Sequence, residues 1–370
     1  FFEPQLAIRQ EGGEGGPGPV IVLRVDPGPA TTVRATDLRF EGDIAQSTDE
    51  EALALRRAIA RDWPLKDGRR FTQAAWDEAK TQALRQLIAR RYPAGRIGDS
   101  LADVDPQAHR AELRLTLDSG PLYRLGPLQV TGLQRYDPSL LRLARLVPGE
   151  VYDQRRLLEA QQRLAASGYF DSAYLTVDPG ADPAAAPVSV QLREAKAQKV
   201  VMGLGFATDS GPRLSLEHVH NQMPLLGWRA PSKLLLDRKS PFMQTEWTSL
   251  PDTDLWRWVG SLRLDRQDDG NLVTDTQRWR LGRLQSGERI DRNLYLQLDR
   301  ATVRSASEVQ PEDTGDGVAL AANFVWSTRR FDRVVQPQAG WGLGIEFGGG
   351  VTLAGRSVPF QRSEIGRAHV

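Results

Sequence analysis

The stretch that most constrains the fold is the alternating run from Val200 to Arg213, VVMGLGFATDSGPR. Large apolar and small residues take turns along it, and successive side chains of a β-strand point to opposite faces. An Asp-Ser-Gly-Pro turn over residues 209–212 ends the run, and the alternation resumes at Leu214. The two segments therefore predict a hairpin with one strongly apolar face. That face carries Met202, Leu204 and Phe206, and the other carries Gly203, Gly205 and Ala207.

The two-residue period continues through segments that begin at Trp256, Leu294, Val318 and Trp341. About nine strands fit between Val200 and Val351 at the lengths that barrels use. A soluble β-sandwich would give the same alternation. Seven of the nine Trp residues follow residue 200, which favours a membrane barrel because Trp side chains gather at membrane interfaces.

Composition removes several other classes of protein. The 48 basic and 47 acidic residues nearly cancel, so no broad positive surface is expected for nucleic acid. The chain has no Cys, which excludes disulfides and thiolate metal sites and suits an oxidising compartment. No apolar run approaches the ~20 residues of a spanning helix. The mean hydropathy of −0.43 still permits a barrel, since alternate residues of a barrel strand face a polar lumen.

Residues before the alternating region contain a repeat. The strand-and-turn segment that ends at Gly28-Pro29 recurs at Gly120-Pro121, and the strand that ends at Gly42 recurs at Gly132, 90 residues later. Each copy predicts the order strand, helix, helix, strand, strand. In the first copy we expect a helix in a capping-box pattern from Thr48 to Trp63, then a helix from about Thr72 to Tyr92, then strands over 96–104 and 111–117.

The second copy predicts the same elements. Asp137-Pro138 is expected to start a helix that Pro148-Gly149 ends, and Asp153 is expected to start the next. Gly168 predicts a left-handed helix end. Strands are expected over 173–177 and 188–192.

Two such modules, the Leu164-x-x-x-Gly168-Tyr169-Phe170 helix exit and the following hairpin together resemble the POTRA-plus-barrel proteins of bacterial outer membranes. Gly203–Arg213 and Phe331–Gly340 are similar to segments of the TamA family, the outer-membrane subunit of the translocation and assembly module. The resemblance implies α+β POTRA modules (β-α-α-β-β) followed by an antiparallel transmembrane β-barrel, here incomplete. It also implies a location in the outer membrane with POTRA modules in the periplasm.

The expected domains follow from the repeat and the resemblance. Residues 1–30 resemble the tail of a POTRA module, because Phe1-Phe2 is similar to Tyr169-Phe170. Residues 31–121 and 122–197 are one POTRA module each, and residues 198–363 are the N-terminal part of the barrel. Residues 364–370 (EIGRAHV) look like a non-native, adapter-derived tail. We therefore expect the chain to be a piece of a longer protein.

The expected function is non-enzymatic assembly of outer-membrane β-barrel or autotransporter clients. An unfolded client can add to a sheet edge as an extra strand through main-chain hydrogen bonds. Our candidate POTRA edge is Tyr169–Val177, with Tyr169, Phe170, Tyr174, Leu175 and Val177. The resemblance implies a lateral gate at the first barrel strand, with candidate residues Val200, Met202, Gly203, Leu204, Gly205 and Phe206. It also implies a TamB-like partner that is anchored in the inner membrane and spans the periplasm. Membrane lipid is the other expected partner, and no cofactor is expected.

Three motifs that suggest chemistry have simpler structural interpretations. Gly98-Asp-Ser-Leu101 matches a short esterase motif, but the spacing from Asp105 to His109 does not fit the required Asp-x-x-His. His218 and His220 share a strand face without a third metal ligand nearby. Gly203-x-Gly205 lacks the third glycine and the helix of a dinucleotide loop. We expect no catalytic residues and no metal.

Three alternatives remain open at this stage. A two-partner secretion transporter and the general barrel-assembly subunit share the architecture. A patatin-like lipase fused to POTRA modules and a barrel would carry its catalytic domain before residue 1.

Overall fold

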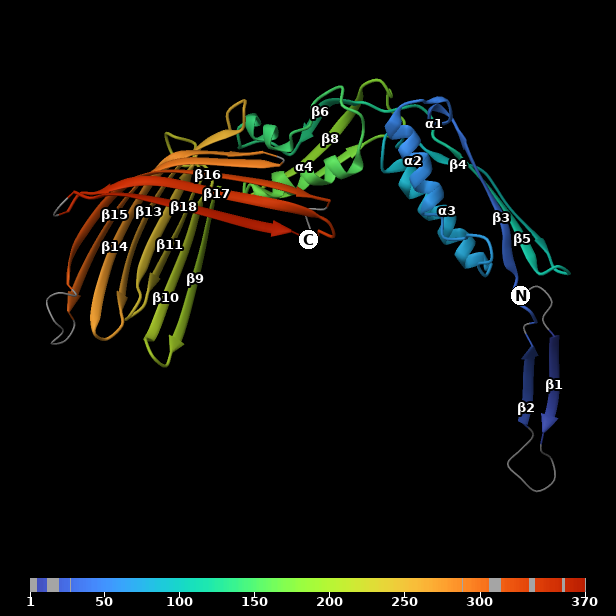
Figure 1. Cartoon of the computed structure of the whole chain (residues 1–370), viewed down its shortest axis with the longest axis horizontal. Helices are drawn as coiled ribbons and strands as arrows, with labels where there is room; N and C mark the ends of the chain where they lie inside the picture. Colours follow the sequence, from blue (N-terminus) through green and yellow to red (C-terminus); the bar gives the residue numbers. More distant parts are fainter. Residues whose placement is uncertain are drawn as a thin grey trace. The chain divides into compact units, whose positions relative to one another are not determined.

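The computed structural model of the chain describes residues 5–11, 20–26, 28–287, 289–305, 314–332, 337–354 and 357–369 (Figure 1). Along them lie a two-stranded hairpin, two α+β modules with three-stranded sheets, and a ten-stranded sheet. This is the predicted order of α+β modules and an incomplete antiparallel barrel. Among the described residues, no helix has the length and apolar character that crossing a membrane requires.

The N-terminal hairpin pairs β1 (Gln5–Glu11) antiparallel with β2 (Val20–Asp26). Leu6 lies opposite Val25 and Ile8 lies opposite Leu23, and all four side chains are exposed. Phe1 and Phe2, which suggested the tail of a further POTRA module, lie outside the described residues. The assignment of residues 1–30 to such a module stays a prediction.

The first complete module follows the predicted element order. Strand β3 (Thr32–Glu41) precedes helices α1 (Asp43–Gln46), α2 (Glu50–Arg61) and α3 (Gln73–Ile88), and strands β4 (Arg96–Asp105) and β5 (Arg110–Asp118) follow. The central strand is β5, which pairs parallel with β3 and antiparallel with β4. Because β3 and β5 run in the same direction, the helices between them can cross one face of the sheet.

The core of this module arises from the helical period. Residues spaced three and four apart on α2 and α3 are buried and meet the buried alternate residues of β5. The rings of Trp63 and Trp76 meet edge to face with centroids 6.0 Å apart. The buried set comprises Ala52, Leu55 and Ile59 on α2, Trp76, Ala79, Ala83 and Leu87 on α3, and Leu113, Leu115 and Leu117 on β5.

The helix starts confirm one predicted start and correct one predicted cap. Helix α3 begins after Thr72, where a helix was predicted to start, and the Thr72 hydroxyl caps it by accepting the N–H of Ala75. The prediction for α2 was wrong, because its cap is Asp49 and not Thr48. The Asp49 carboxylate accepts the N–H of Glu51 at 3.1 Å and is also an acceptor for Arg91, so it satisfies two donors.

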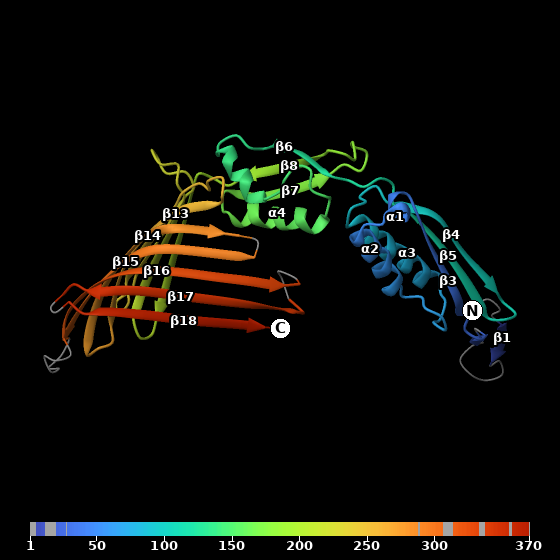
Figure 2. The ribbon, with the colours of Figure 1, turned by 45° about the horizontal axis from the view of Figure 1, so that its top comes forward.

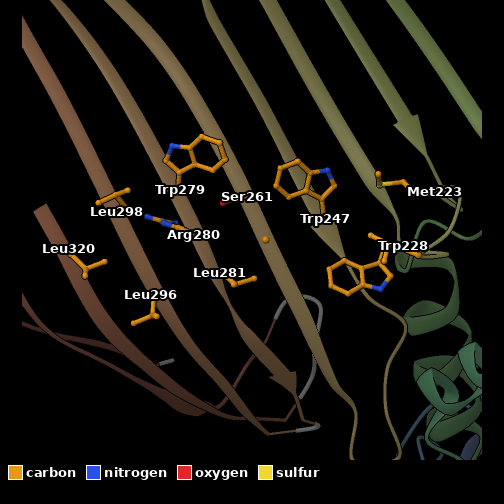
Figure 3. A pocket seen from close by; sticks show the side chains of 12 residues that line it. Met223, Trp228, Trp247, Ser261, Trp279, Arg280, Leu281, Leu296, Leu298 and Leu320 are labelled. Atoms are coloured by element: carbon orange, nitrogen blue, oxygen red, sulfur yellow. The ribbon is translucent and has the colours of Figure 1, made fainter. Parts of the chain in front are cut away.

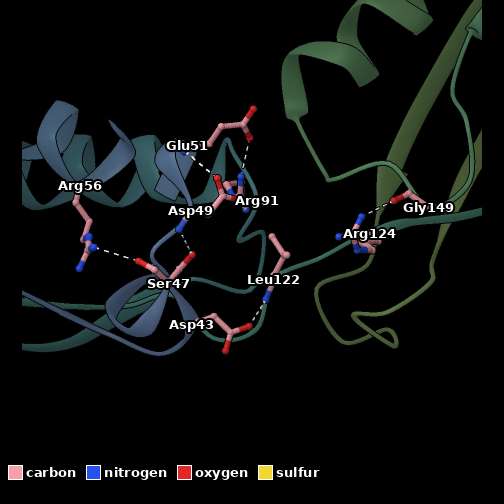
Figure 4. Close-up of polar contacts among 9 residues, drawn as sticks. All are labelled: Asp43, Ser47, Asp49, Glu51, Arg56, Arg91, Leu122, Arg124 and Gly149. Atoms are coloured by element: carbon pink, nitrogen blue, oxygen red, sulfur yellow. Dashed lines mark hydrogen bonds and ion pairs between the residues drawn. The ribbon is translucent and has the colours of Figure 1, made fainter. Parts of the chain in front are cut away.

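Arg91 links this module to the next one, and Figure 4 shows its side chain beside Asp49 and Glu51. Its N–H donates to the carbonyl of Tyr152 at 2.8 Å, and its carbonyl accepts the N–H of Tyr123 at 2.9 Å. Nearby, the Leu122 N–H donates to Asp43 Oδ2 at 2.8 Å. The connection between the two modules is therefore hydrogen-bonded on both sides.

The second module contains β6 (Leu125–Thr131), a 3₁₀ helix η1 (Pro138–Ala144), α4 (Gln154–Ala166), β7 (Phe170–Val177) and β8 (Ala186–Glu194). Its sheet order is β6-β8-β7, with β6 parallel to β8. Asp137 caps η1 through the Ser139 N–H and Pro138 occupies its first turn, as predicted.

Two helix ends in this module test the predicted stops. The first helix ends at Ala144, before the predicted Pro148-Gly149 stop, because Arg145 adopts a left-handed conformation (φ 53°). A 3₁₀ helix has poorer hydrogen-bond geometry, which suits one short segment but not a long helix. Gly168 does take the predicted left-handed conformation, with φ 79°.

The barrel sheet is an antiparallel meander in which each strand pairs with its neighbours in sequence (Figure 2). It has ten strands, and nine of them end before residue 353, in agreement with the roughly nine that were predicted up to Val351. The tenth covers residues 359–369 and so includes Glu364–His369, which the sequence suggested to be a non-native tail. Strands β9 and β18 are the two edges of the sheet and do not pair with each other. The strands are β9 (Gln198–Ala207), β10 (Gly211–His220), β11 (Ala230–Leu236), β12 (Phe242–Thr248), β13 (Trp256–Asp268), β14 (Leu272–Ser286), β15 (Ile290–Ser305), β16 (Gly315–Phe331), β17 (Gly340–Thr352) and β18 (Pro359–His369).

Candidate functional site

The predicted gate residues lie on β9, an edge strand of the barrel sheet. Within the described part of the chain β9 pairs only with β10, in a register that sets Leu204 opposite Leu214. Its apolar side chains are highly exposed: Met202 is 73% exposed, Leu204 87% and Phe206 79%. Each such side chain gains about 1.5–3 kcal/mol when it leaves water, so this face is built for an apolar environment. Val200 is also exposed.

The two gate glycines differ in their surroundings. A Cβ at Gly203 would lie 2.6 Å from the Ser215 hydroxyl oxygen, whereas one at Gly205 would meet nothing within 4 Å. Close packing against β10 therefore explains Gly203. Gly205 gains no such packing, and a glycine inside a strand costs conformational entropy.

The predicted POTRA edge lies on β7, which is an edge strand of its sheet. Tyr169, Phe170 and Leu175 are buried, Val177 is half-buried, and Tyr174 is 58% exposed. Most of the predicted side chains therefore belong to the module's core. What this edge offers to a partner is its backbone and the Tyr174 side chain.

The start of β7 is tied to the segment that leads into β9. The Ala195 N–H donates to the carbonyl of Tyr169 at 2.8 Å, and the Tyr136 hydroxyl donates to the carbonyl of Ala195 at 2.8 Å. The ring of Tyr136 meets those of Tyr169 and Phe170 edge to face at 5.4 and 6.3 Å. The two candidate strands are thus joined through a single packed cluster.

The carboxylate of Glu194 completes this cluster. It accepts the N–H groups of Gln134, Arg135 and Tyr136 at 2.8–3.0 Å. A backbone N–H pocket around a carboxylate favours its charged form, and the pKa of Glu194 is lowered by these bonds even though desolvation acts to raise it. Sequence reasoning missed Glu194, because nothing local marks a glutamate at a strand end as an acceptor for a loop 60 residues away.

A second link at the same junction runs through Arg229. Its Nε donates to Asn221 Oδ1 at 3.1 Å, and Asn221 donates to the carbonyls of Lys196 and Ala197 at 2.9 and 2.7 Å. The Arg229 guanidinium lies so close to Gly168 that a Cβ there would approach it to 2.7 Å. Gly168 therefore serves the helix end and the junction at once.

The tryptophans gather at one end of the barrel sheet. This is the end of the sheet that holds the β10–β11 turn and the start of β9. Six of the seven Trp residues after residue 200 lie within about five residues of the strand ends there. Trp279 is nearer the middle of its strand. The sequence predicted that these residues lie at a membrane interface, and the structure gathers six of them at one end of the sheet. The six are Trp228, Trp247, Trp256, Trp258, Trp326 and Trp341.

The motifs that suggested chemistry occupy ordinary structural positions. Gly98–Leu101 lies in β4, and Asp105 Oδ1 accepts the N–H groups of the β4–β5 turn. His218 and His220 lie in β10 with ring centroids 6.1 Å apart, and His220 contacts Gln198. The described residues contain no group of three side chains suited to a metal ion.

Comparison with known proteins identifies the two parts of the chain. The POTRA family, described as a surface antigen variable number repeat, matches residues 123–195, which hold the second module. BamA from Haemophilus ducreyi lacking POTRA domains 1–3 is similar with a TM-score of 0.57 and 16% identity, over 88% of this chain and 64% of that one. CdiB from Acinetobacter baumannii has a TM-score of 0.41 and 13% identity, over 93% and 69%. The chain thus spans 64% of the BamA structure's length. It contains a POTRA module followed by an incomplete barrel sheet with the fold of the BamA barrel.

Proposed function

We propose that the chain is part of an outer-membrane assembly factor of the TamA type. The POTRA modules lie in the periplasm and the barrel lies in the outer membrane. The protein acts without catalytic chemistry, and its clients are unfolded β-barrel proteins, autotransporters among them. The observation that carries this proposal is the edge strand β9, which exposes Met202, Leu204 and Phe206 and follows a POTRA module directly.

The mechanism follows from the two edge strands. An unfolded client strand adds first to the backbone of β7, because main-chain pairing is largely independent of sequence. It then pairs with β9 at an opened seam of the barrel, where lipid is on one side and the lumen on the other. Each hydrogen bond that the seam loses is replaced by one to the client, so the exchange costs little net free energy.

Two partners complete the proposal. Lipid covers the apolar face of the barrel sheet, and a TamB-like subunit anchored in the inner membrane docks on the POTRA modules. Among the described residues, the exposed apolar face of the hairpin β1–β2, with Leu6, Ile8 and Leu23, is the apolar surface we assign to an adjoining module or to that subunit.

Cysteine cross-linking tests the client path, because the chain has no Cys of its own. Tyr174→Cys on β7 and Gly205→Cys on β9 are placed in the full-length protein, and a client carries one Cys in a barrel strand. We expect a disulfide to the client at both positions during assembly. Glu78→Cys on the exposed side of α3 is the matched control and should not cross-link. Equal cross-linking at all three positions, or none at β7 and β9, contradicts the proposal.

The general barrel-assembly subunit is the second candidate, since the BamA barrel has the same fold. Depletion of the full-length protein separates the two. Loss of autotransporters alone supports the TamA-type role, and loss of most outer-membrane barrels supports the general role.

A further inference from the structure

A groove of about 480 Å³ lies in the apolar face of the barrel sheet, between Trp247 on β12 and Trp279 on β14 (Figure 3). Gly260 of β13 lies between these two strands, opposite Trp247 and Leu281. A Cβ at Gly260 would come within 3.1 Å of the Trp247 ring. The groove therefore exists because one residue of β13 has no side chain at a position flanked by large ones.

The groove is lined almost wholly by apolar side chains. Leu281 and Leu296 continue it across β14 and β15, and both are more than half exposed. Arg280 also borders it, but its guanidinium donates to Gln297 and stacks on Tyr295, which belong to the opposite face of the sheet. No charged group therefore points into the groove.

The β10–β11 turn forms one end of the groove. Met223, Leu226 and Trp228 line it from this turn, as Figure 3 shows for Met223 and Trp228. Leu225 is fully exposed with φ 69°, a left-handed conformation that costs a leucine about 1–2 kcal/mol. Hydrogen bonds from Met223 to Trp228 and from Gly227 to Met223, both 2.8 Å, hold the turn in this shape.

We propose that this groove, which we call the acyl groove, binds one acyl chain of a phospholipid from the leaflet on the POTRA side. The inference rests on the proposed function, because it requires the barrel to lie in a membrane. Leu225 and Leu226 extend the turn into the same leaflet. The acyl groove lies at the end of the sheet where six tryptophans gather, which is the interface position of an aromatic girdle.

A client strand does not fit this site. Strands β12, β13 and β14 are hydrogen-bonded to neighbours on both sides, so no backbone edge is free for strand addition. An acyl chain needs no hydrogen bonds. An acyl chain in a bilayer gains little free energy from leaving the other lipid tails. The acyl groove therefore binds it through shape and van der Waals contact, because the groove would otherwise be poorly filled.

Phospholipid retention tests the acyl groove in the full-length protein. The protein is extracted in detergent and washed, and the bound phospholipid is counted by mass spectrometry. We expect about one phospholipid per wild-type protein, and about tenfold less for Gly260→Leu, the factor that ~1.4 kcal/mol of lost binding gives. Gly349→Leu is the matched control. Gly349 lies in the same cross-strand row as Gly260, and a Cβ there meets nothing within 4 Å, so retention should not change.

A second variant guards against a folding defect in Gly260→Leu. Leu226→Asn leaves every barrel strand unchanged and removes the apolar end of the acyl groove, so it should also lose the phospholipid. Heat-modifiable migration in the gel reports whether each variant forms a barrel. If wild type folds but retains no phospholipid, or holds lipopolysaccharide or a second copy there instead, the inference is wrong. Retention by both folded variants also overturns it. These results leave the assembly proposal standing, whereas a wild-type protein that forms no barrel contradicts both.

Discussion

The guanidinium of Arg91 donates to the carboxylate of Asp49 at 2.5 Å, although 42 positions separate the two residues in sequence. Arg91 also donates to Glu51 at 2.6 Å, and its side chain is only 8% exposed. Its backbone meanwhile bonds to Tyr123 and Tyr152 of the second module. One residue thus joins the start of α2, through the side chain that Figure 4 shows, to the connection between two modules.

Arg91→Ala should destabilise the start of α2 and the connection between the two modules. Loss of charge-assisted hydrogen bonds to partly exposed carboxylates costs about 1–3 kcal/mol of local stability. Hydrogen exchange of the full-length protein should therefore become faster at the start of α2 and at residues 122–124 and 152. Arg57→Ala, on the exposed face of the same helix, is the control and should leave exchange unchanged. The variant keeps the main-chain bonds of residue 91 to Tyr123 and Tyr152, so faster exchange confined to α2 would show that the Arg91 side chain does not stabilise the connection between the modules.

Gly168→Ala should disturb the POTRA–barrel junction beyond the cost of its backbone. The left-handed conformation at φ 79° costs an L-residue about 1–2 kcal/mol, and the new Cβ displaces Arg229 from Asn221. Gly149→Ala is the matched control, because it has φ 90° but nothing within 4 Å of a Cβ. Thermal unfolding should show the larger loss for Gly168→Ala. Adding Arg229→Ala to Gly168→Ala should recover only the stability that was lost to the clash with Arg229. Equal losses for Gly168→Ala and Gly149→Ala would contradict the close approach of Arg229 to Gly168.

Asp237 should make the stability of the barrel depend on pH at the β11–β12 turn, which lies at the opposite end of the sheet from the β10–β11 turn. In the β11–β12 turn its carboxylate accepts the N–H groups of Lys239 and Ser240 and the hydroxyl of Ser210, and these bonds lower its pKa to about 2. A carboxylate whose pKa is lower in the folded than in the unfolded state stabilises the fold above the unfolded value of about 3.9. That contribution is lost as the pH falls from about 3.9 towards 2.

The measurement is the heat-modification midpoint of the full-length barrel between pH 5 and pH 2. The wild-type midpoint should fall more steeply with acid than that of Asp237→Asn, which cannot titrate at this position. If the midpoints of wild type and Asp237→Asn fell in parallel with pH, the charged Asp237 carboxylate would not stabilise the fold through its bonds to Ser210 and the β11–β12 turn.

Element types were largely predictable from local patterns. The 3.6-residue and two-residue periods identified the helices and strands, and Gly168 and Thr72 identified two ends, because these signals depend on the residues themselves. Sheet order is set by contacts distant in sequence, so the position of β7 at an edge needed the structure to test it. The same holds for Asp49 as an acceptor for Arg91 and for Glu194 as an acceptor for a loop, since both depend on partners in other segments.

The candidate sites were predictable only in part. Alternation assigned Leu204 and Phe206 to one face, and their exposure agrees with an apolar environment outside the chain. The same alternation could not distinguish the buried core residues Tyr169 and Phe170 from an accessible edge. The exposed Leu225 also had no sequence signal, because no local pattern marks a left-handed leucine.

The central claim is that the apolar face of the barrel sheet lies in lipid, and adjacent residues of β9 test it. Leu204→Arg puts a charge on that face and Gly205→Arg puts the same charge on the opposite face, where a Cβ meets nothing within 4 Å. A charge on the lipid face costs up to about 2–4 kcal/mol at the bilayer midplane, whereas the lumen face tolerates it. The measurement is the fraction of full-length protein that migrates as folded barrel after insertion into bilayers across a urea series. The account predicts a clear loss for Leu204→Arg and little change for Gly205→Arg. Because Leu204 is 87% exposed in the chain itself, an unchanged folded fraction for Leu204→Arg would mean that water surrounds this face, which contradicts the account.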